Sequence, residues 1–573
     1  MKRTRSELSL LALLTSAALA TAGCGGAEAG ARPGPDAGSK LDAGPASPDG
    51  GDGGGGGGGG GTQDGGGGGG GGGTQDGGGG GGGGGGTTPV TPSACTSPVQ
   101  LYNTSAPTAA VVGTGRPETC TEADLRAKVA QGGVITFDCG PNPVTIAITQ
   151  TMRPHATRDT IIDGNHKVTL DAEQRARHFT IEHPDWQKDT TKFVVQRLKI
   201  INGKAPTGEY FPPRPENPKC AYGYKEGSGG AIYAHDGVVH IIDSEFRDNQ
   251  AALIGPDVGG GAVYVLGNNA LVISGSRFTN NRAANGGAVG MLWANPKIFN
   301  SVFENNTAEG VGQNVQLPES ENCPVFGHEG QGGAGGLGGG IYFDGMNNDG
   351  FVYTICGSTF KNNRANELSG ALFRTPNVAV RNMAIERSTF DGNTAKMGGV
   401  SFIMENDLKV SDSTFMNNKS GVDIEGKPSF AIFGGLWVYK GSLEVVNSTF
   451  FNNTPDGLWL EEASGTLTNV TISKSRLSGS LTVNNSLFTE TECDDTPFAG
   501  RYNVQWPNAQ ACAQGTTFAN PALGAAGNNG GPTPTLLPGT VSAVRGVGRN
   551  CPSTDQRGRT RATNACSAGS VEP

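Results

Sequence analysis

The chain has 573 residues, 96 of them glycine, and its formal net charge at pH 7 is −9. This acidic balance argues against a nucleic-acid-binding surface, because such a surface needs a stripe of basic residues. Much of the glycine lies in one segment near the N-terminus, so the rest of the chain has a more ordinary composition.

Residues 1–24 have the features of an export signal. Lys2, Arg3 and Arg5 form a basic start, residues 8–20 form an apolar run, and residues 21–23 form a small-residue cleavage site. Because Cys24 follows at once, the segment resembles a bacterial lipoprotein signal, in which this cysteine is lipidated and becomes the mature N-terminus. The alternative is ordinary cleavage near Gly23, which releases a secreted protein. Elsewhere no apolar run approaches the ~20 residues that a membrane helix needs.

Residues 25–94 are dominated by Gly, Ala, Pro and Asp and cannot bury a core. We expect a disordered linker. A flexible chain of about 70 residues has a typical end-to-end distance of roughly 45 Å, by the ~5–6 Å × √n scaling of such chains. This linker would hold a folded domain clear of a membrane surface. The alternative is a glycine-rich recognition segment.

The folded part is expected to begin near Cys95. Residues 121–124 (Thr-Glu-Ala-Asp) have the pattern of a capping box, and Leu125 and Val129 share one helical face. We therefore predict a short helix through about Ala130. Short apolar runs at residues 133–137, 144–148, 160–164 and 194–203 follow and predict the first strands.

A repeat unit then recurs in seven copies before residue 455. Aligning one phenylalanine from each copy places Asn three residues after it, Ser two before it, and Ile or Val five before it. A glycine lies further upstream in every copy. The aligned phenylalanines are Phe246, Phe278, Phe303, Phe360, Phe390, Phe415 and Phe450. Self-similarity of this kind is the signature of a solenoid.

The unit predicts a coil of short strands. Alternate residues of each apolar run point to one face, and the runs are too short for globular helices. Asn and Gly tolerate left-handed backbone, so the Asn and Gly columns are expected at corners. The tightest spacing, about 25 residues, suffices for three strands and three corners. Stacked coils bury one continuous core, so we predict a parallel β-helix of roughly a dozen coils, with the short helix over its open end and Asn and Ser ladders along it.

Two resemblances support this fold. The Gly-Gly-Ala-Ile and Phe-x-x-Asn repeats resemble those of right-handed β-helix proteins of the polymorphic outer-membrane protein type, within the pectin-lyase-like superfamily. The C-terminal part resembles the closing signature of bacterial choice-of-anchor Q proteins, through residues 529–533 (Asn-Gly-Gly-Pro-Thr), Cys551, residues 555–558 (Asp-Gln-Arg-Gly), Arg561, Cys566, Gly569 and Glu572. Together the resemblances imply an all-β, right-handed, single-stranded parallel β-helix over about residues 95–573.

We therefore expect four segments: a lipoprotein signal (1–24), a linker (25–94), a β-helix (95–490) and a C-terminal cap (491–573), where Pro, Gly and Cys replace the repeat. The 11 cysteines suit an oxidising compartment, and without Cys24 an even ten remain. Connectivity cannot be deduced from sequence. The preferred pairs are Cys120 with Cys139, Cys493 with Cys512, Cys551 with Cys566 and, between two loops, Cys220 with Cys323. The alternative is that some cysteines, Cys356 especially, are simply buried thiols.

Four insertions exceed the shortest gap between the Asn column and the next Gly column: residues 204–228, 250–259, 307–337 and 419–433. All leave from one corner of the coil, so stacking gathers them on one side, which in solenoids is often the binding face. They carry aromatic residues, which a loop that only faces solvent does not need. These candidate ligand-binding residues are Tyr210, Phe211, Tyr222, Tyr224, His328, Glu329, Phe430 and Phe433. The alternative is that the aromatic rings pack against the side of the β-helix.

Many β-helices cleave polysaccharides, and such chemistry needs clustered carboxylates, either to hold Ca²⁺ or to act as acid and base. The outward position after each aligned phenylalanine shows no acidic stripe. Asp494 and Asp495 follow Cys493 in the tail, where a turn is the simpler interpretation. Asp163 is expected in a structural turn, and Arg197 has no evident acidic partner.

Lys199 likewise has no evident acidic partner in the sequence. The seven histidines, among them His178 and His183, show no metal-ligand spacing. We therefore expect no catalytic residue, no metal site and no cofactor. Calcium enters only if the enzyme alternative holds.

Two hypotheses of different classes follow. The first is a monomeric outer-membrane lipoprotein, displayed at the cell surface, whose β-helix binds a surface polysaccharide or protein through the loop side and binds no nucleic acid. The second is a polysaccharide lyase or glycoside hydrolase. The first predicts loss of binding when residues 204–228 and 307–337 are deleted. The second predicts two or more carboxylates within about 6–9 Å across neighbouring coils.

Overall fold

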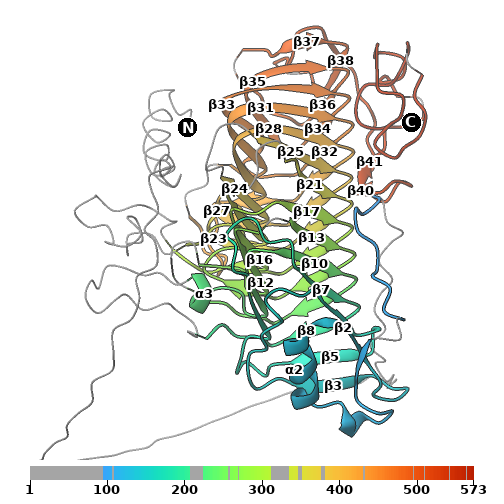
Figure 1. Ribbon diagram of the computed structural model, residues 1–573. Helices are drawn as coiled ribbons and strands as arrows, with labels where there is room; N and C mark the ends of the chain where they lie inside the picture. Colours follow the sequence, from blue (N-terminus) through green and yellow to red (C-terminus); the bar gives the residue numbers. More distant parts are fainter. Residues whose placement is uncertain are drawn as a thin grey trace, which may run out of the picture. The chain divides into compact units, whose positions relative to one another are not determined.

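The computed structural model describes residues 95–573 apart from residues 106–108, 207–223, 254, 256–257, 269, 312–334, 346–350, 376–380, 430–432, 495, 509, 541 and 563. The expected signal with Cys24 and the expected linker lie outside the described residues. The described strands wind into a right-handed parallel β-helix, which confirms the predicted fold (Figure 1).

One strand of nearly every coil belongs to a 14-stranded parallel sheet, which we call sheet B. It is the sheet of the aligned phenylalanines. Its strands are β3 (Val144–Ala147), β5 (Val168–Asp171), β8 (Lys199–Ile201), β11 (Glu245–Arg247), β14 (Arg277–Thr279), β18 (Val302–Glu304), β22 (Thr359–Lys361), β26 (Thr389–Asp391), β29 (Thr414–Met416), β32 (Thr449–Phe451), β34 (Thr471–Ser473), β36 (Leu487–Thr489), β38 (Asn503–Trp506) and β39 (Thr516–Phe518).

Sheet A has 20 strands in two parallel runs that merge at β28. The first half of β28 pairs with β24, and its second half pairs with β25. The first run is β6 (Phe179–Glu182), β9 (Ile232–His235), β12 (Val263–Leu266), β16 (Val289–Leu292), β20 (Ile341–Asp344) and β24 (Leu372–Thr375). The second run is β1 (Ala110–Val112), β2 (Gly133–Phe137), β4 (Thr160–Asp163), β7 (Lys192–Gln196), β10 (Val238–Ile242), β13 (Ala270–Ser274), β17 (Pro296–Phe299), β21 (Tyr353–Cys356) and β25 (Arg381–Glu386). The merged strands are β28 (Ser401–Ser411), β31 (Leu436–Val446), β33 (Asp456–Thr468) and β35 (Arg476–Asn484), followed by the short β37 (Ala499–Arg501).

A third, five-stranded sheet C completes the middle coils. Its strands are β15 (Arg282–Ala283), β19 (Thr307–Ala308), β23 (Arg364–Leu368), β27 (Thr394–Met397) and β30 (Lys419–Ser420). After β30 the coils shorten. Equivalent ladder positions lie 35 residues apart between Ser413 and Ser448, but 16 apart between Val470 and Ser486.

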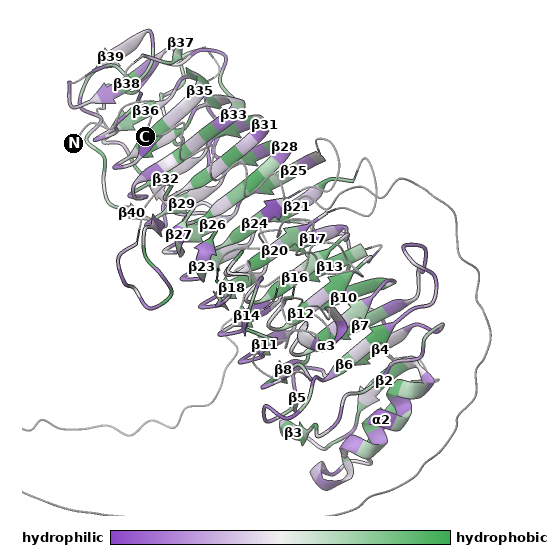
Figure 2. Ribbon diagram, turned by 90° about the vertical axis from the view of Figure 1, so that its left-hand side faces the viewer, coloured by the Kyte–Doolittle hydropathy of each residue, from purple (hydrophilic) through white to green (hydrophobic). Residues whose placement is uncertain are grey.

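The aligned phenylalanines form a stack inside the β-helix, as predicted. All seven are fully buried. Neighbouring ring centroids are 4.8–5.0 Å apart and the rings are within 7° of parallel. In Figure 2 the hydrophobic positions follow the strands of the stack. Each ring therefore buries its faces against the rings above and below, which stabilises the coil register.

The aligned asparagines form the expected ladder. In Asn306, Oδ1 accepts the backbone N–H of Asn281 at 3.0 Å and its Nδ2 at 2.9 Å. Its own Nδ2 donates to the Phe278 carbonyl at 3.0 Å. The serines repeat in the same way, since Oγ of Ser276 accepts the N–H of Ser244 at 3.1 Å. These contacts satisfy polar groups that burial would otherwise leave without partners.

The corners differ in detail from the prediction. The left-handed residue is the one before the ladder asparagine, for example Asn280 with φ 56°. The same shift occurs at the glycines, where Gly286 has φ 56°. The aligned Gly287 is needed for another reason: a Cβ there would lie 2.2 Å from the carbonyl oxygen of Gly339 in the next coil. The aligned glycine therefore recurs because the backbones of neighbouring coils approach closely there, and not because it adopts a left-handed conformation.

The predicted helix is α2 (Glu122–Gln131), preceded by a 3₁₀ turn, η1 (Pro117–Thr119). Oγ1 of Thr121 accepts the N–H of Asp124 at 3.2 Å, and Leu125 and Val129 are fully buried. The helix lies against β1 and β2 at the N-terminal end of the stack (Figure 1). It covers apolar residues that have no coil beyond them.

The coils continue past the expected boundary at residue 490, because β37, β38 and β39 add further turns. Phe498, Cys512 and Ala513 are buried and fill the end of the core. Residues 519–573, the tail, then return along the corner between sheets A and B. Apart from a two-stranded hairpin of β40 (Ala526–Gly527) and β41 (Thr535–Leu536), the described tail is irregular.

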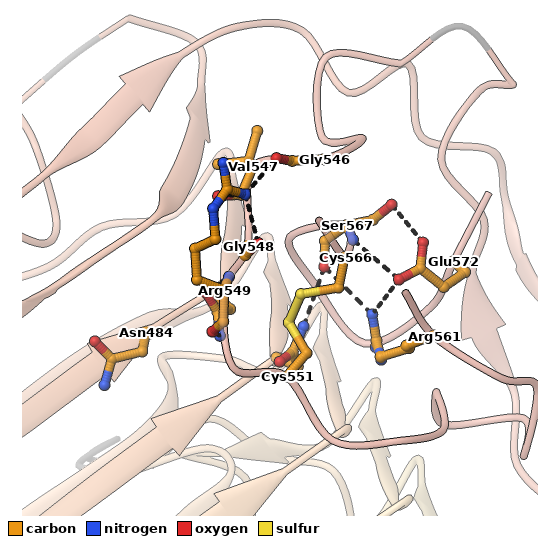
Figure 3. Close-up of a disulfide and its surroundings, with 12 residues drawn as sticks. Asn484, Gly546, Val547, Gly548, Arg549, Cys551, Arg561, Cys566, Ser567 and Glu572 are labelled. Atoms are coloured by element: carbon orange, nitrogen blue, oxygen red, sulfur yellow. Dashed lines mark hydrogen bonds and ion pairs between the residues drawn. A yellow bond between two sulfur atoms is a disulfide. The ribbon is translucent and has the colours of Figure 1, made fainter. Parts of the chain in front are cut away.

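The tail is held by a buried polar cluster of Asp555, Gln556, Arg557, Arg561 and Glu572, which we call the clasp. Figure 3 shows the part formed by Arg561 and Glu572. Arg557 Nη2 lies 2.7 Å from the Asp555 carboxylate, and the N–H of Glu572 donates to the same carboxylate at 3.0 Å. Arg561 Nη1 lies 3.2 Å from the Glu572 carboxylate. Burial opposes ionisation of Asp555, but the hydrogen bonds from Arg557 and Glu572 outweigh it and hold the pKa of Asp555 below its usual value.

The clasp also contacts the coils. Nη2 of Arg561 donates to the Gly569 carbonyl at 2.9 Å and to Oδ1 of Asn447 at 3.3 Å. Nε2 of Gln556 donates to Thr414 Oγ1 at 2.8 Å, and Thr449 Oγ1 donates to Gln556 Oε1 at 2.7 Å. The residues that resemble a closing signature thus fasten the tail to the side of the last coils.

The structure joins three of the preferred cysteine pairs: Cys120–Cys139, Cys493–Cys512 and Cys551–Cys566. Cys220 and Cys323 lie outside the described residues. Cys356 is not a buried thiol, and that alternative is wrong, because Cys356 is bonded to Cys95. Their sequence separation of 261 explains why spacing did not suggest the pair.

Candidate functional site

The candidate binding residues of the insertions are described only in part. Tyr210, Phe211, Tyr222, His328, Glu329 and Phe430 lie outside the described residues. Tyr224 is the first residue of the short helix α3 (Tyr224–Gly227). Phe433 is 4% exposed, with its ring 4.2 Å from that of Trp437 and 4.5 Å from that of Trp459, centroid to centroid. Phe433 therefore packs against the β-helix.

Phe433 covers an aromatic layer on the outside of sheet A. Alternate residues of the first run and of the merged strands point outward and pair from coil to coil, as Phe373 does with Phe402 at 5.5 Å. Leu337 and Leu368 pack on the same layer. The layer residues are Tyr233, Tyr264, Tyr342, Phe373, Phe402, Trp437 and Trp459. Most are nearly fully buried, and they form two apolar clusters, one around Tyr233 and Tyr264 and one from Tyr342 to Trp459.

Trp186 is different, since 41% of its surface is exposed. It lies in a turn between β6 and β7. Its ring stacks on that of His235 at 5.1 Å and meets that of Trp293 nearly edge-on at 5.8 Å. Gly267 lies against the indole, because a Cβ there would come within 2.4 Å of the ring. One side of the indole is thus packed on the β-helix while much of the ring faces solvent.

The turn that carries Trp186 is fixed at both ends. Nδ1 of the buried His183 lies 2.6 Å from the carbonyl oxygen of Ala156. The carboxylate of Asp236 accepts the N–H of Gln187 and, at 2.8 Å, the N–H of Gly237. The indole of Trp186 is thus ordered before a ligand binds, which lowers the conformational entropy that binding would cost.

Sequence reasoning missed Trp186 because the residue lies outside the four insertions, among early coils whose repeat is weak. A signal was present. Residues 184–189 (Pro-Asp-Trp-Gln-Lys-Asp) place one tryptophan in an otherwise polar turn. A large apolar ring at such a position is more typical of a contact surface than of a solvated loop.

A second arrangement of interest lies in the C-terminal coils. Arg476 Nε lies 3.6 Å from Asp456 Oδ1, and its Nη2 lies 3.7 Å from Asp494 Oδ1. Oγ of Ser478 donates to Asp494 at 2.8 Å. Burial raises the pKa of Asp456 to about 7, with Arg476 opposing the rise and the carboxylates of Asp494 and Glu492 adding to it. This brings carboxylates together on neighbouring coils, although the Asp456 side chain is only 4% exposed.

Asp163 is the last residue of β4, and its carboxylate accepts the N–H of Asn165 in the turn that follows, so its role is structural, as expected. Its carboxylate accepts Nε of Arg197 at 2.9 Å and Oγ1 of Thr104 at 2.6 Å. The expectation that Arg197 and Lys199 lack acidic partners is wrong, because Arg197 pairs with Asp163 and Lys199 Nζ lies 3.4 Å from the Glu245 carboxylate. These partners are 34 and 46 residues away, so only the stacking of coils brings them together.

His178 and His183, the histidines named from the sequence, are buried and contact backbone carbonyl oxygens. Nε2 of His178 lies 3.1 Å from the Leu170 carbonyl oxygen, and burial lowers the pKa of His178 to about 4. In the part of the chain that the structure describes, no group of three or more His, Cys, Asp and Glu side chains is arranged to hold a metal ion. Within the same residues, no helix has the length and apolar character to cross a membrane.

Comparison with known proteins agrees with the fold. Residues 335–486 match the family described as right handed beta helix region. No curated protein sequence matches the chain. Among solved structures, the crystal structure of PfbA, a surface adhesin of Streptococcus pneumoniae, is similar at 12% identity over 75% of this chain and 100% of that one, with a TM-score of 0.29. Likeness at this level carries no argument about function.

Proposed function

We propose that the protein is an exported bacterial lipoprotein, held at the cell surface through Cys24, that binds a surface polysaccharide or protein with the side of its β-helix. The export signal and the lipoprotein-like cysteine support the location. The disulfides also support it, because such bonds persist in oxidising compartments. The ladders of Asn and Ser make each coil rigid, which suits a protein that presents a surface at a distance from a membrane.

The single observation that carries the binding proposal is the exposed, pre-ordered indole of Trp186. Tryptophan is enriched among the few residues that dominate binding energy at interfaces. The turn of Trp186 lies beside the first insertion, since Lys225 Nζ of α3 reaches the carboxylate of Glu182 at 2.6 Å. The described end of the first insertion, at Lys225, therefore contacts the strand that leads into the turn of Trp186.

The test is Trp186→Ala in the full exported chain, with binding measured on a glycan array and on immobilised extracellular-matrix proteins. We expect at least one probe to bind the wild type and to lose ten-fold or more in affinity with the variant. Trp506→Ala is the matched control, because Trp506 is also 41% exposed but lies on β38, near the C-terminal end. Equal binding by wild type and the Trp186 variant would contradict the proposal. Deletion of residues 204–228 or 307–337 should also weaken attachment.

A second candidate function rests on the carboxylates around Arg476. A carboxyl group with a pKa near 7 can donate a proton to a leaving oxygen, while a neighbouring carboxylate activates water. Asp456 and Asp494 would fill these roles in a polysaccharide-cleaving enzyme. The test is incubation with pectin, alginate or a host polymer and measurement of new chain ends. Cleavage that Asp456→Asn abolishes would favour this candidate over the first. The low exposure of Asp456 is the reason that we place it second.

A further inference from the structure

The first described residues, 95–105, do not enter the β-helix at its N-terminal end. They form a strap that runs along the corner between sheets A and B, from the middle of the stack toward α2 (Figure 1). At the start of the strap, Cys95 is bonded to Cys356, the last residue of β21. Its N–H donates to Oδ1 of Asn300 at 3.2 Å, and Nδ2 of Asn300 donates to its carbonyl at 2.8 Å.

The other end of the strap is held several coils earlier. The N–H of Tyr102 donates to Oε1 of Gln196 at 2.8 Å, and the Tyr102 hydroxyl lies 2.8 Å from Nδ1 of His240. Thr104 Oγ1 donates to Asp163 at 2.6 Å. Between these ends the strap is loosely packed, because Leu101 is 46% exposed. A hollow separates residues 95–101 from the corner beneath them.

The attachment point lies at the midpoint of the stack. Cys356 precedes β22, which is the seventh of the 14 strands of sheet B. The strand β21 pairs with β17 on one side and β25 on the other, so Cys356 belongs to an interior coil. The tail occupies the same corner further along, from Asp412 to Asn485. Both ends of the folded chain thus lie on one corner, while α3 and sheet C lie on the opposite side (Figure 1).

We propose that the Cys95–Cys356 disulfide is the mechanical attachment point of the protein, which transfers tension from the N-terminal segment directly into the middle coils. Its role in the cell rests on the proposed surface anchoring, whereas the mechanical property does not. Tension between the N-terminal segment and the coils after Cys356 bypasses residues 96–355. The α2 cap and the early coils lie within this shielded stretch.

The reason is the direction of the strap. Without the disulfide, a pull on Cys95 would load the strap contacts one after another, starting at Asn300 and ending at Asp163. Individual hydrogen bonds yield readily when they are loaded in sequence, since each exchanges with water at little net cost. After the strap, the pull would reach η1 and α2 and then unwind the first coils. The covalent bond removes this route.

Single-molecule force spectroscopy tests the proposal. The full exported chain is held by tags at its two ends, and its released length is recorded under oxidising conditions. Wild type should never release the segment between Cys95 and Cys356. The double variant Cys95→Ala/Cys356→Ala should release up to ~900 Å more, for 261 residues at ~3.6 Å each. It should also begin to unfold at lower force.

The matched control is Cys120→Ala/Cys139→Ala, whose pair has a separation of 19 residues. In the wild-type background this variant should not change the released length, because its cysteine pair lies between Cys95 and Cys356. Added to the Cys95/Cys356 variant, it should lengthen the release by only ~70 Å. Release of the full segment by oxidised wild type, or identical traces for wild type and the Cys95/Cys356 variant, would overturn the proposal.

A measurement on the unchanged protein covers the case in which the variant does not fold. Proteolysis of the unreduced chain followed by mass spectrometry should recover a fragment with Cys95 joined to one with Cys356. Absence of that fragment, with the other disulfides recovered, overturns the proposal. Loss of binding at rest in Trp186→Ala with an unchanged force trace concerns the proposed function, whereas a changed force trace in the cysteine variant concerns this inference.

Discussion

The coils of the repeat, up to about residue 455, and the coils that follow are stabilised by different means. In the repeat each coil supplies the same contacts to the next, through stacked phenylalanines and the Asn and Ser ladders. Beyond Phe450 these columns lapse. The phenylalanine column continues as Ile472, Phe488 and Gln505, and Ser475 takes the place of the ladder asparagine. In these coils, and on the last two coils of the repeat, the tail supplies contacts that do not repeat.

One solenoid is therefore held together in two ways. A periodic ladder spreads its stabilisation evenly, so no single coil depends on a distant segment. The tail concentrates stabilisation of the last coils in a few buried polar groups that belong to a segment as much as 100 residues further along the chain. Removal of one clasp group should therefore loosen the last coils together, whereas removal of one ladder group should act locally.

The largest expected effect comes from Arg561→Ala in the clasp. Arg561 is 3% exposed, and its loss removes the charged partner of Glu572 and a hydrogen bond to the Gly569 carbonyl. Breaking a buried charge pair in this way typically costs about 3–5 kcal/mol. Hydrogen exchange should show faster exchange throughout residues 456–573 and little change before residue 400. Arg559→Ala, at an exposed position of the same segment, is the control. Unchanged exchange in the last coils would refute the role of the clasp.

Asn363→Ala should show the contrasting behaviour of the ladder. Oδ1 of Asn363 accepts two N–H groups of Asn306, and its Nδ2 donates to the Phe303 carbonyl at 2.9 Å. Leaving such buried groups without partners costs about 1–3 kcal/mol each, so we expect about 2–4 kcal/mol in all. Faster exchange should be confined to the coils of β18, β22 and β26. Spread of the effect to residues 456–573 would remove the distinction between the two regions.

Stability should also depend on pH through the C-terminal coils. Burial raises the pKa of Asp456 to about 7, and burial with the neighbouring Glu462 raises that of Glu461 to about 7. A group whose pKa is raised by folding stabilises the fold below its unfolded value and loses that contribution as pH rises through its folded value. Urea unfolding should thus show a decline in stability between about pH 4 and pH 7.

Asp456→Asn should reduce this decline and be more stable than wild type at pH 8, by about 1–3 kcal/mol. Glu425→Gln, at an exposed carboxylate, is the control. A variant that is less stable than wild type at pH 8 would show that Asp456 favours the fold when ionised, contrary to the assignment of its pKa.

The weakest effect that we expect compares one column of the repeat where the tail covers it and where the tail does not. Thr449 and Thr389 both precede an aligned phenylalanine, but the tail covers Thr449 and leaves Thr389 partly exposed. Oγ1 of Thr449 donates to Gln556 and lies 2.9 Å from Oγ of Ser570. Thr449→Val should cost about 1 kcal/mol, the net value of a typical hydrogen bond. Thr389→Val should be nearly neutral. Equal thermal shifts for the two variants would show that the tail contacts add nothing.

The sequence predicted the repeat region well because its columns report physical contacts directly. An inward phenylalanine or a ladder asparagine touches its own counterpart in the next coil, so the contact recurs in the sequence. The contacts that were missed join unlike residues over long separations. Asp163 with Arg197 and Cys95 with Cys356 depend on which corners face each other, and no repeat carries that information.

The same distinction applies to the candidate site. The spacing of the repeat revealed the insertions. It did not reveal which of their aromatic rings pack against the β-helix, as that of Phe433 does. Trp186 is recognisable only once its ring is seen against His235 and Gly267. The carboxylates around Arg476 lie on successive coils in a region where the repeat had lapsed, so their alignment could not be followed.

The shortening of the coils after β30 bears on where the protein tolerates added chain. Successive ladder serines are 57 residues apart where a large insertion leaves the coil, between Ser301 and Ser358, but only 17 residues separate Ser486 from Asn503 near the end. A circumference of 17 residues is filled by its strands and bends. The long coils can therefore accept an inserted epitope or a fused reporter without disturbing neighbouring coils. An insertion into the short C-terminal coils would separate neighbouring strands. Among related sequences, we therefore expect insertions in the long coils before β30 and a constant length in the short coils after it.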